Sequence, residues 1–174
     1  MSADETTGSF LELDGRPAVR FSREYDNPVE QVWALVATPH GLAAWFPSPQ
    51  VELDLKPGGT IRFSGDPHMP ESRGTVRAAE PGRLLAFTWG DDELRFELTE
   101  LGPDQTRLQL VDLLESAQAA ARNAAGWELC LRALDARASG APAPERQPDA
   151  WLPLYRAYQA AGFPSGAPVP GLDE

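Results

Sequence analysis

Apolar and polar residues alternate in a series of short runs between residues 10 and 113, which predicts β-strands. In the clearest run, Leu94, Phe96 and Leu98 alternate with Arg95 and Glu97, so one face of the strand is apolar and the other is charged. Comparable runs, separated by turn-forming Gly, Pro and Asp residues, occupy residues 10–13, 19–23, 51–55, 60–64, 74–78, 84–89, 94–101 and 106–113. The first two runs predict a hairpin, and those from residue 51 onward predict an antiparallel meander.

Helical spacing replaces this alternation between the hairpin and the meander. Apolar residues recur every three or four positions from Val29 to Val36, directly after Asn27-Pro28. This pattern predicts a helix that begins at Pro28, with Asn27 capping its free amide groups. Pro39 ends the helix, because proline cannot continue it, and a second short helix is expected over residues 41–46.

The longest predicted helix follows the meander. Residues 116–138 contain no proline and are rich in alanine, which favours a helix. Its apolar stripe consists of Ala120, Ala124, Trp127, Leu131 and Leu134. Because the apolar face of the meander must be covered, this helix is the expected cover. The sequence therefore predicts an α+β fold in which a curved antiparallel sheet wraps around a long C-terminal helix.

The chain divides into three predicted parts. Residues 1–15 form an N-terminal segment that could add an edge strand, and residues 16–140 form the main domain. Residues 141–174 are a proline-rich extension with a short helix expected at about 150–161. The apolar residues that recur at helical spacing in this helix include Trp151, Leu154, Tyr155 and Tyr158. Trp151 and Tyr158 could pack on the body of the protein or across the axis of a homodimer, and the sequence does not choose.

Composition narrows the classes of function. The chain has 174 residues, of which 42% are hydrophobic, enough for one domain with a core. Its formal charge of -11 argues against nucleic acid as a partner, since nucleic-acid binders carry basic patches. One cysteine cannot form an intrachain disulfide, and no apolar stretch is long enough to span a bilayer. We therefore expect a cytoplasmic protein without membrane insertion.

Several short motifs carry a resemblance to a known family. They are Val32 to Pro39 (VWALVATP), Leu42 to Phe46 (LAAWF), Leu55 to Gly59 (LKPGG), Gly74 to Val76 (GTV), Glu80 to Leu84 (EPGRL), Thr88-Trp89, and Ala125 to Trp127 (AGW). Together with the order of the elements, they resemble the helix-grip fold of the SRPBCC superfamily, which includes START-like and birch-pollen-allergen-like proteins. Within it, the chain is most similar to a bacterial family related to the activator of the heat-shock-protein-90 ATPase.

A cavity is expected between the sheet and the long helix, because a strongly curved sheet cannot press every inward side chain against one straight helix. The side chains predicted to line it are Trp45, Phe46, Phe63, Trp89, Phe96, Asn123, Trp127 and Cys130. An inward aromatic residue is more often plain core than a ligand contact. Asn123 is a stronger candidate, because a buried amide needs a hydrogen-bond partner. His68, in a proline-flanked loop, is a candidate for the cavity mouth.

The sequence offers little for catalysis or for metal binding. Neither histidine lies in a catalytic motif, and there is no His or Cys spacing typical of a metal site. The acidic run at residues 91–93 is interpreted as a solvated hairpin turn, and Cys130 as a small filler of the helix. We predict no catalytic residue, no metal and no cofactor.

Three functions follow from these patterns and from the resemblance. The favoured hypothesis is a non-enzymatic protein that holds a small hydrophobic or amphipathic ligand in the cavity. The resemblance also implies a co-chaperone-like module that binds a partner protein, as the name of the family suggests. A third hypothesis is a cyclase- or aromatase-like enzyme that uses the cavity to position a reactive chain.

Overall fold

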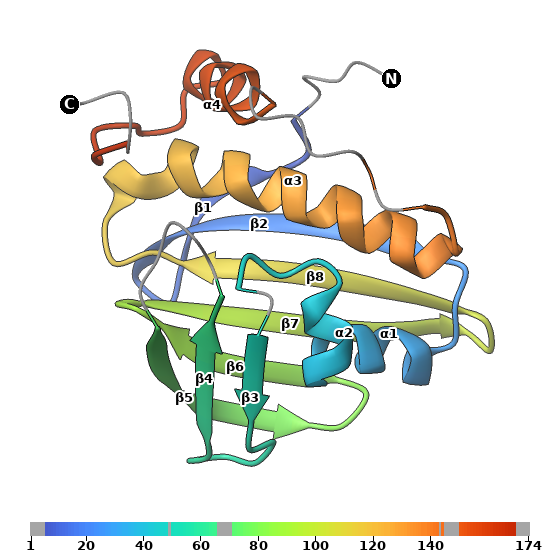
Figure 1. Cartoon of the computed structure of the whole chain (residues 1–174). Helices are drawn as coiled ribbons and strands as arrows, with labels where there is room; N and C mark the ends of the chain where they lie inside the picture. The colour runs from blue at the N-terminus through green and yellow to red at the C-terminus, as the bar shows by residue number, and fades with distance from the viewer. Residues whose placement is uncertain (1–5, 49, 66–70, 143, 145–149, 170–174) are drawn as a thin grey trace.

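Eight antiparallel strands form one curved sheet in the computed structural model, which describes residues 6–48, 50–65, 71–142, 144 and 150–169 (Figure 1). The strand order is β1-β2-β8-β7-β6-β5-β4-β3, so the N-terminal hairpin joins the last strand of the meander. The strands are β1 (Ser9–Leu13), β2 (Arg16–Tyr25), β3 (Gln50–Leu53), β4 (Thr60–Ser64), β5 (Ser72–Glu80), β6 (Leu84–Trp89), β7 (Asp92–Gly102) and β8 (Gln105–Leu113). The predicted hairpin and meander are confirmed.

The helices form two further layers. Helix α3 (Ala120–Ser139) lies across the sheet after a short 3-10 turn at Ala117–Ala119, and α4 (Trp151–Ala160) packs on α3 on the side away from the sheet (Figure 1). Two short helices, α1 (Val29–Val36) and α2 (Pro39–Ala43), connect β2 to β3. The predicted α+β fold, a sheet wrapped around a long helix, is confirmed.

Alternation along the strands and one helix stripe build the core. Leu94, Phe96 and Leu98 are buried, as their alternation with charged residues predicts. The whole predicted stripe of α3 is buried as well: Ala120, Ala124, Trp127, Leu131 and Leu134. Removing these apolar surfaces from water is the main favourable contribution to holding the helix on the sheet.

Both short helices begin differently from their predictions. Pro28 is the N-cap residue of α1, and no side chain caps the helix, so Asn27 does not cap it as expected. Instead, Asn27 Nδ2 donates to the carbonyl of Ala138 at 2.9 Å and ties the start of α1 to the end of α3. Helix α2 begins two residues before the predicted start, because Thr38 Oγ1 accepts from Gly41 N at 3.0 Å and caps it there.

A buried carboxylate joins α4 and the N-terminal segment to α3. Glu128 accepts hydrogen bonds from the Tyr158 hydroxyl and from Thr7 Oγ1, the latter at 2.8 Å. Tyr158 Oη in turn accepts from Gly8 N at 2.9 Å. Tyr158 is therefore fully buried within its own chain, and Trp151 stacks on Tyr155 with ring centroids 4.8 Å apart. None of the described helices combines the length and the apolar character needed to cross a bilayer.

Candidate functional site

Seven aromatic side chains meet between the sheet and α3. This aromatic cluster consists of Trp45, Phe46, Phe63, Phe87, Trp89, Phe96 and Trp127. Phe46 lies at its centre, with its ring centroid 5.5 Å from that of Phe63, 5.7 Å from Trp127 and 5.8 Å from Trp89. These are ordinary distances for packed aromatic pairs, so the rings fill the space they share.

The members of the cluster differ in how they are held. Trp45 Nε1 donates to the carbonyl of Leu35 at 2.8 Å, and Trp127 Nε1 donates to Asp112 Oδ2 at 3.0 Å. Phe46 has no polar atom in its side chain, and it lies in the turn after α2, where its amide donates to Leu42 O. Packing alone therefore holds the Phe46 ring in place.

Trp89 lies at the solvent-facing edge of the cluster. It is the last residue of β6, and its side chain is half-buried, with the ring centroid 5.3 Å from that of Trp127. Its Nε1 atom is buried and finds no acceptor within the described part of the chain. Buried polar groups in proteins almost always have a partner, and an unmade hydrogen bond there costs about 1–3 kcal/mol. Within the described part of the chain, this donor is therefore available to an acceptor from outside it.

A carboxyl pair, Asp92 and Asp112, lies beside this edge. Asn123 Nδ2 is 3.2 Å from Asp92 Oδ2 and 3.2 Å from Asp112 Oδ2, so the amide on α3 bridges carboxyl groups of β7 and β8. Asp92 Oδ1 also accepts from Glu115 N at 2.9 Å. Asp112 is fully buried, whereas Asp92 is half-buried.

The environment of Asp112 favours its protonated form. Burial raises the pKa of Asp112 well above its usual range, and the charge and hydrogen bond of Asp92 raise it further. The donors Trp127 Nε1 and Asn123 Nδ2 act in the opposite direction on this pKa, but more weakly. Asp112 therefore keeps its proton to a higher pH than an ordinary aspartate.

The structure corrects the interpretation of residues 91–93 as a solvated turn. Asp91 is exposed, but Asp92 turns toward α3 and joins the carboxyl pair. Glu93 pairs with Arg95 at 2.8 Å. The interpretation was wrong because turn composition does not reveal which side chains point inward, and in a two-residue hairpin the first residue of the next strand already belongs to the sheet.

The predicted site residues are placed unequally. All six predicted aromatic residues belong to the cluster. Asn123 lies beside the cluster, because its amide donates to Asp112, which also accepts from Trp127. Cys130 is half-buried on α3, one turn beyond Trp127, and packs against the main core. His68 lies outside the described residues. Whether any of these side chains contacts a ligand stays a prediction.

Two residues of the cluster region were missed from the sequence. Phe87 shares the inward face of β6 with Leu85 and Trp89, so alternation alone could have added it. Asp112 follows the buried Leu108 and Leu110 on the same face of β8, and a charged residue at such a position was the available signal.

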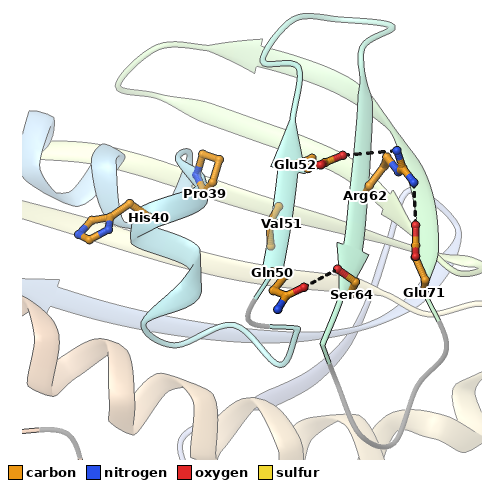
Figure 2. A pocket seen from close by; sticks show the side chains of 8 residues that line it. All are labelled: Pro39, His40, Gln50, Val51, Glu52, Arg62, Ser64 and Glu71. Carbon is orange, nitrogen blue, oxygen red and sulfur yellow. Dashed lines mark hydrogen bonds and ion pairs between the residues drawn. The ribbon is translucent and has the colours of Figure 1, made fainter.

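A hollow of about 530 Å³ lies elsewhere, at the edge of the sheet where β3 meets α2 (Figure 2). It is lined by Pro39, His40, Gln50, Val51, Glu52, Arg62, Ser64 and Glu71, which include none of the residues predicted to line the cavity. Figure 2 shows Arg62 between Glu52, at 3.4 Å, and Glu71, at 2.7 Å. Because two carboxylates already neutralise this guanidinium, the hollow is poorly suited to bind an anion.

An open, curved antiparallel sheet around a long helix, with two short helices between its second and third strands, defines a helix-grip protein of the START-like, or SRPBCC, class. The model of the family described as Activator of Hsp90 ATPase homolog 1-like protein matches residues 26–139, and the chain belongs to this family. The resemblance carried by the sequence motifs is therefore confirmed.

Solved structures with the same fold come from several organisms. A conserved protein of unknown function from Enterococcus faecalis is similar with a TM-score of 0.71 and 22% identity, over 89% of this chain and 90% of that one. CalU16 from Micromonospora echinospora has a TM-score of 0.69 and 25% identity, over 90% and 96% of the two chains. The Aha1 dimer from Colwellia psychrerythraea has a TM-score of 0.58 and 17% identity, over 70% and 95%. No curated protein matches the chain.

Membership of this family supports either a ligand-binding module or a co-chaperone-like module of the helix-grip fold.

Proposed function

We propose that this protein binds a small hydrophobic or amphipathic molecule between the sheet and α3, at the aromatic cluster. The observation that carries the proposal is the buried Trp89 Nε1 atom, which has no acceptor among the described residues although it lies against an otherwise apolar wall. A ligand with an apolar body and one polar atom would satisfy both features. The residues expected to contact it are the predicted ones: Trp45, Phe46, Phe63, Trp89, Phe96, Asn123, Trp127 and Cys130.

Phe46 is the side chain that a ligand would displace. Its ring occupies the centre of the cluster, and packing alone holds it, whereas hydrogen bonds anchor the indoles of Trp45 and Trp127. A shift of one ring would open space surrounded by aromatic side chains from both the sheet and α3. This binding mode requires an opening step, so the apparent affinity is lower than for a preformed cavity.

The test is a titration with prodan, an uncharged naphthalene dye whose fluorescence rises in apolar surroundings. The wild-type protein is expected to bind it, and Phe46→Ala is expected to bind it more tightly because no ring must then be displaced. Phe163→Ala is the matched control, since Phe163 contacts Phe10 and Tyr158 outside the cluster. Phe46→Leu serves as a milder variant if Phe46→Ala is not folded. Equal binding by the Phe46 and Phe163 variants would place the dye elsewhere and contradict the proposal.

A co-chaperone-like function is the second candidate, and the match to the family named for the Hsp90 ATPase activator favours it. In that case a surface of the protein would matter more than its interior. Measured ATP turnover of a heat-shock-protein-90 chaperone, with and without the protein, distinguishes the two functions. A change in turnover that Phe46→Ala leaves intact would favour the surface function.

A cyclase- or aromatase-like enzyme is the third candidate. The carboxyl pair favours it, because a neutral, buried carboxyl group can donate a proton. In such an enzyme Asp112 would be the proton donor and the aromatic cluster would position the chain. The hydrogen bonds of Asp112 to Trp127 and Asn123 also explain its burial structurally, which ranks this candidate below ligand binding.

The location and assembly complete the proposal. One cysteine in the chain suits a reducing compartment such as the cytoplasm. A homodimer is compatible with the Aha1 dimer among the structural neighbours. Tyr158 is fully buried within its own chain, whereas Trp151 is half-buried and stacks on Tyr155 of the same helix, so Trp151 can still contribute to a dimer interface.

A further inference from the structure

We propose that the site selects its ligand by charge and by one hydroxyl group: it takes uncharged aromatic alcohols of the phenol type and rejects carboxylates of the same shape. This inference rests on the proposed function, because it concerns the ligand of the same aromatic cluster. It comes from the pairing of Asp92 with Trp89 across two strands, since the Trp89 indole N–H has no acceptor among the described residues.

Trp89 and Asp92 are neighbours at the end of the β6–β7 hairpin. They are directly opposite in the register of the two strands, so their side chains lie on the same face of the sheet. In such pairs the Cβ atoms are about 4.5–5.5 Å apart. On that face, the Trp89 ring packs on Trp127 and Phe46. The edge of the cluster thus presents an aromatic wall, an N–H donor and a carboxylate together.

A hydroxyl group matches both polar groups. Trp89 Nε1 can only donate, and it needs an acceptor. Each Asp92 oxygen already accepts one hydrogen bond, from Glu115 N and from Asn123 Nδ2, and each oxygen has a second lone pair. A hydroxyl can accept from Trp89 and donate to Asp92 at the same time. A ligand without a donor would leave Asp92 unused, and a ligand without an acceptor would leave Trp89 unpartnered.

A carboxylate on the ligand meets like charge at this edge. It could accept from Trp89, but it would lie beside the Asp92 carboxylate, with Asp112 behind it. Two cations lie nearby, and both already donate to protein oxygens. Arg122 on α3 donates to Asn123 Oδ1 at 3.1 Å and to Pro168 O at 3.0 Å, and Arg16 on β2 donates to Asp91 O at 3.2 Å and to Leu113 O at 3.1 Å. The chain as a whole carries -11, which adds to the repulsion. The site is therefore unfavourable for fatty acids and for aromatic acids.

The size of the ligand follows from the ring it replaces. The Phe46 ring is in contact with rings on three sides, Phe63 on β4, Trp89 on β6 and Trp127 on α3. A flat aromatic body can stack where this ring lies, because offset and edge-to-face packing suits such surroundings. One or two fused rings with a hydroxyl on the rim fit this description.

The test compares three probes of one shape, 2-naphthol, 2-naphthoate and naphthalene, by titration at neutral pH. Wild-type protein is expected to bind 2-naphthol roughly tenfold more tightly than either of the others. Asp92→Asn should reduce the preference for 2-naphthol over 2-naphthoate. Asp91→Asn is the matched control, because Asp91 is exposed in the same turn and the substitution changes the net charge equally.

Each outcome separates this inference from the proposed function. If no probe binds the wild-type protein, the proposed function fails. If 2-naphthoate binds as well as 2-naphthol, ligand binding stands and the selection by charge is overturned. Trp89→Phe provides an independent check, because it removes the N–H donor but keeps a ring, and it should reduce the preference for 2-naphthol over naphthalene to what the Asp92 contact alone gives. A preference as large in Trp89→Phe as in the wild-type protein would overturn the role of that donor.

Discussion

Trp127 Nε1 on α3 donates a hydrogen bond to Asp112 Oδ2 on β8 at 3.0 Å, and both side chains are almost completely buried. Together with the bonds of Asn123 to Asp92 and Asp112, this contact is a polar link between the long helix and the middle of the sheet. The strength of this hydrogen bond and the protonation state of Asp112 can both be measured.

Replacing Asp112 should separate the loss of the hydrogen bond from the loss of charge. Asp112→Ala leaves Trp127 Nε1 and one Asn123 contact without an acceptor, and should lower the free energy of unfolding by about 1–3 kcal/mol. Asp112→Asn keeps an acceptor and mimics the neutral carboxyl group, so it should remain close to wild type. Urea unfolding of the three proteins measures the difference. Equal losses in both variants would contradict a neutral Asp112.

Stability should depend on pH through Asp112. A carboxyl group whose pKa is higher in the folded protein than in the unfolded chain binds more protons when folded. Its contribution to stability is therefore present at low pH, and it is lost as the pH rises from about 3.9, the ordinary Asp value, toward the raised pKa. Relative to Asp112→Asn, wild type should lose stability over this window. If the free energy of unfolding changes with pH in the same way for both proteins, the raised pKa of Asp112 is contradicted.

The attachment of α4 should depend on the Tyr158 hydroxyl. Tyr158→Phe removes the donor to Glu128 and the acceptor of Gly8 N, so a buried carboxylate loses one of its partners. Amide hydrogen exchange should accelerate in residues 151–160, with little change in β6–β8. Tyr155→Phe is the matched control, because it removes a hydroxyl from the same helix that donates to Ser165 O at 3.2 Å and not to Glu128. The same acceleration in both variants would argue against the role of Glu128.

Phe46 should be important for stability as well as for binding. It is almost fully buried, and its truncation to alanine leaves a cavity among rings, which typically costs about 3–5 kcal/mol for phenylalanine. Phe163→Ala should cost less, because Phe163 is only partly buried. Thermal unfolding with and without 2-naphthol tests both effects. 2-Naphthol should stabilise Phe46→Ala more than wild type, because it fills the space left by the ring, whereas Phe163→Ala should gain no more than wild type.

Much of the fold could be predicted because its signals are local. The alternation at Leu94, Phe96 and Leu98 and the stripe that includes Trp127 and Leu131 each depend on residues within a few positions of one another. Neighbouring residues determine whether a strand or a helix has an apolar face, so the sequence alone was sufficient. The predicted helix starts were wrong where a residue distant in the sequence provides a competing contact. Asn27, for example, donates to Ala138 O instead of capping α1.

The candidate site was only partly accessible in the same way. The sequence by itself determined six of the seven aromatic residues of the cluster, because strand and helix periodicity indicates which side chains point inward, and the same alternation could have added Phe87. Only the tertiary structure decided that Asp92 and Asp112, 20 positions apart, share Asn123, and that Phe46 fills the centre of the cluster. The physical reason is that the register of β6, β7 and β8 and the packing of α3 on these strands bring the side chains together. Register and helix packing depend on contacts distributed over the whole chain, which local patterns do not reveal.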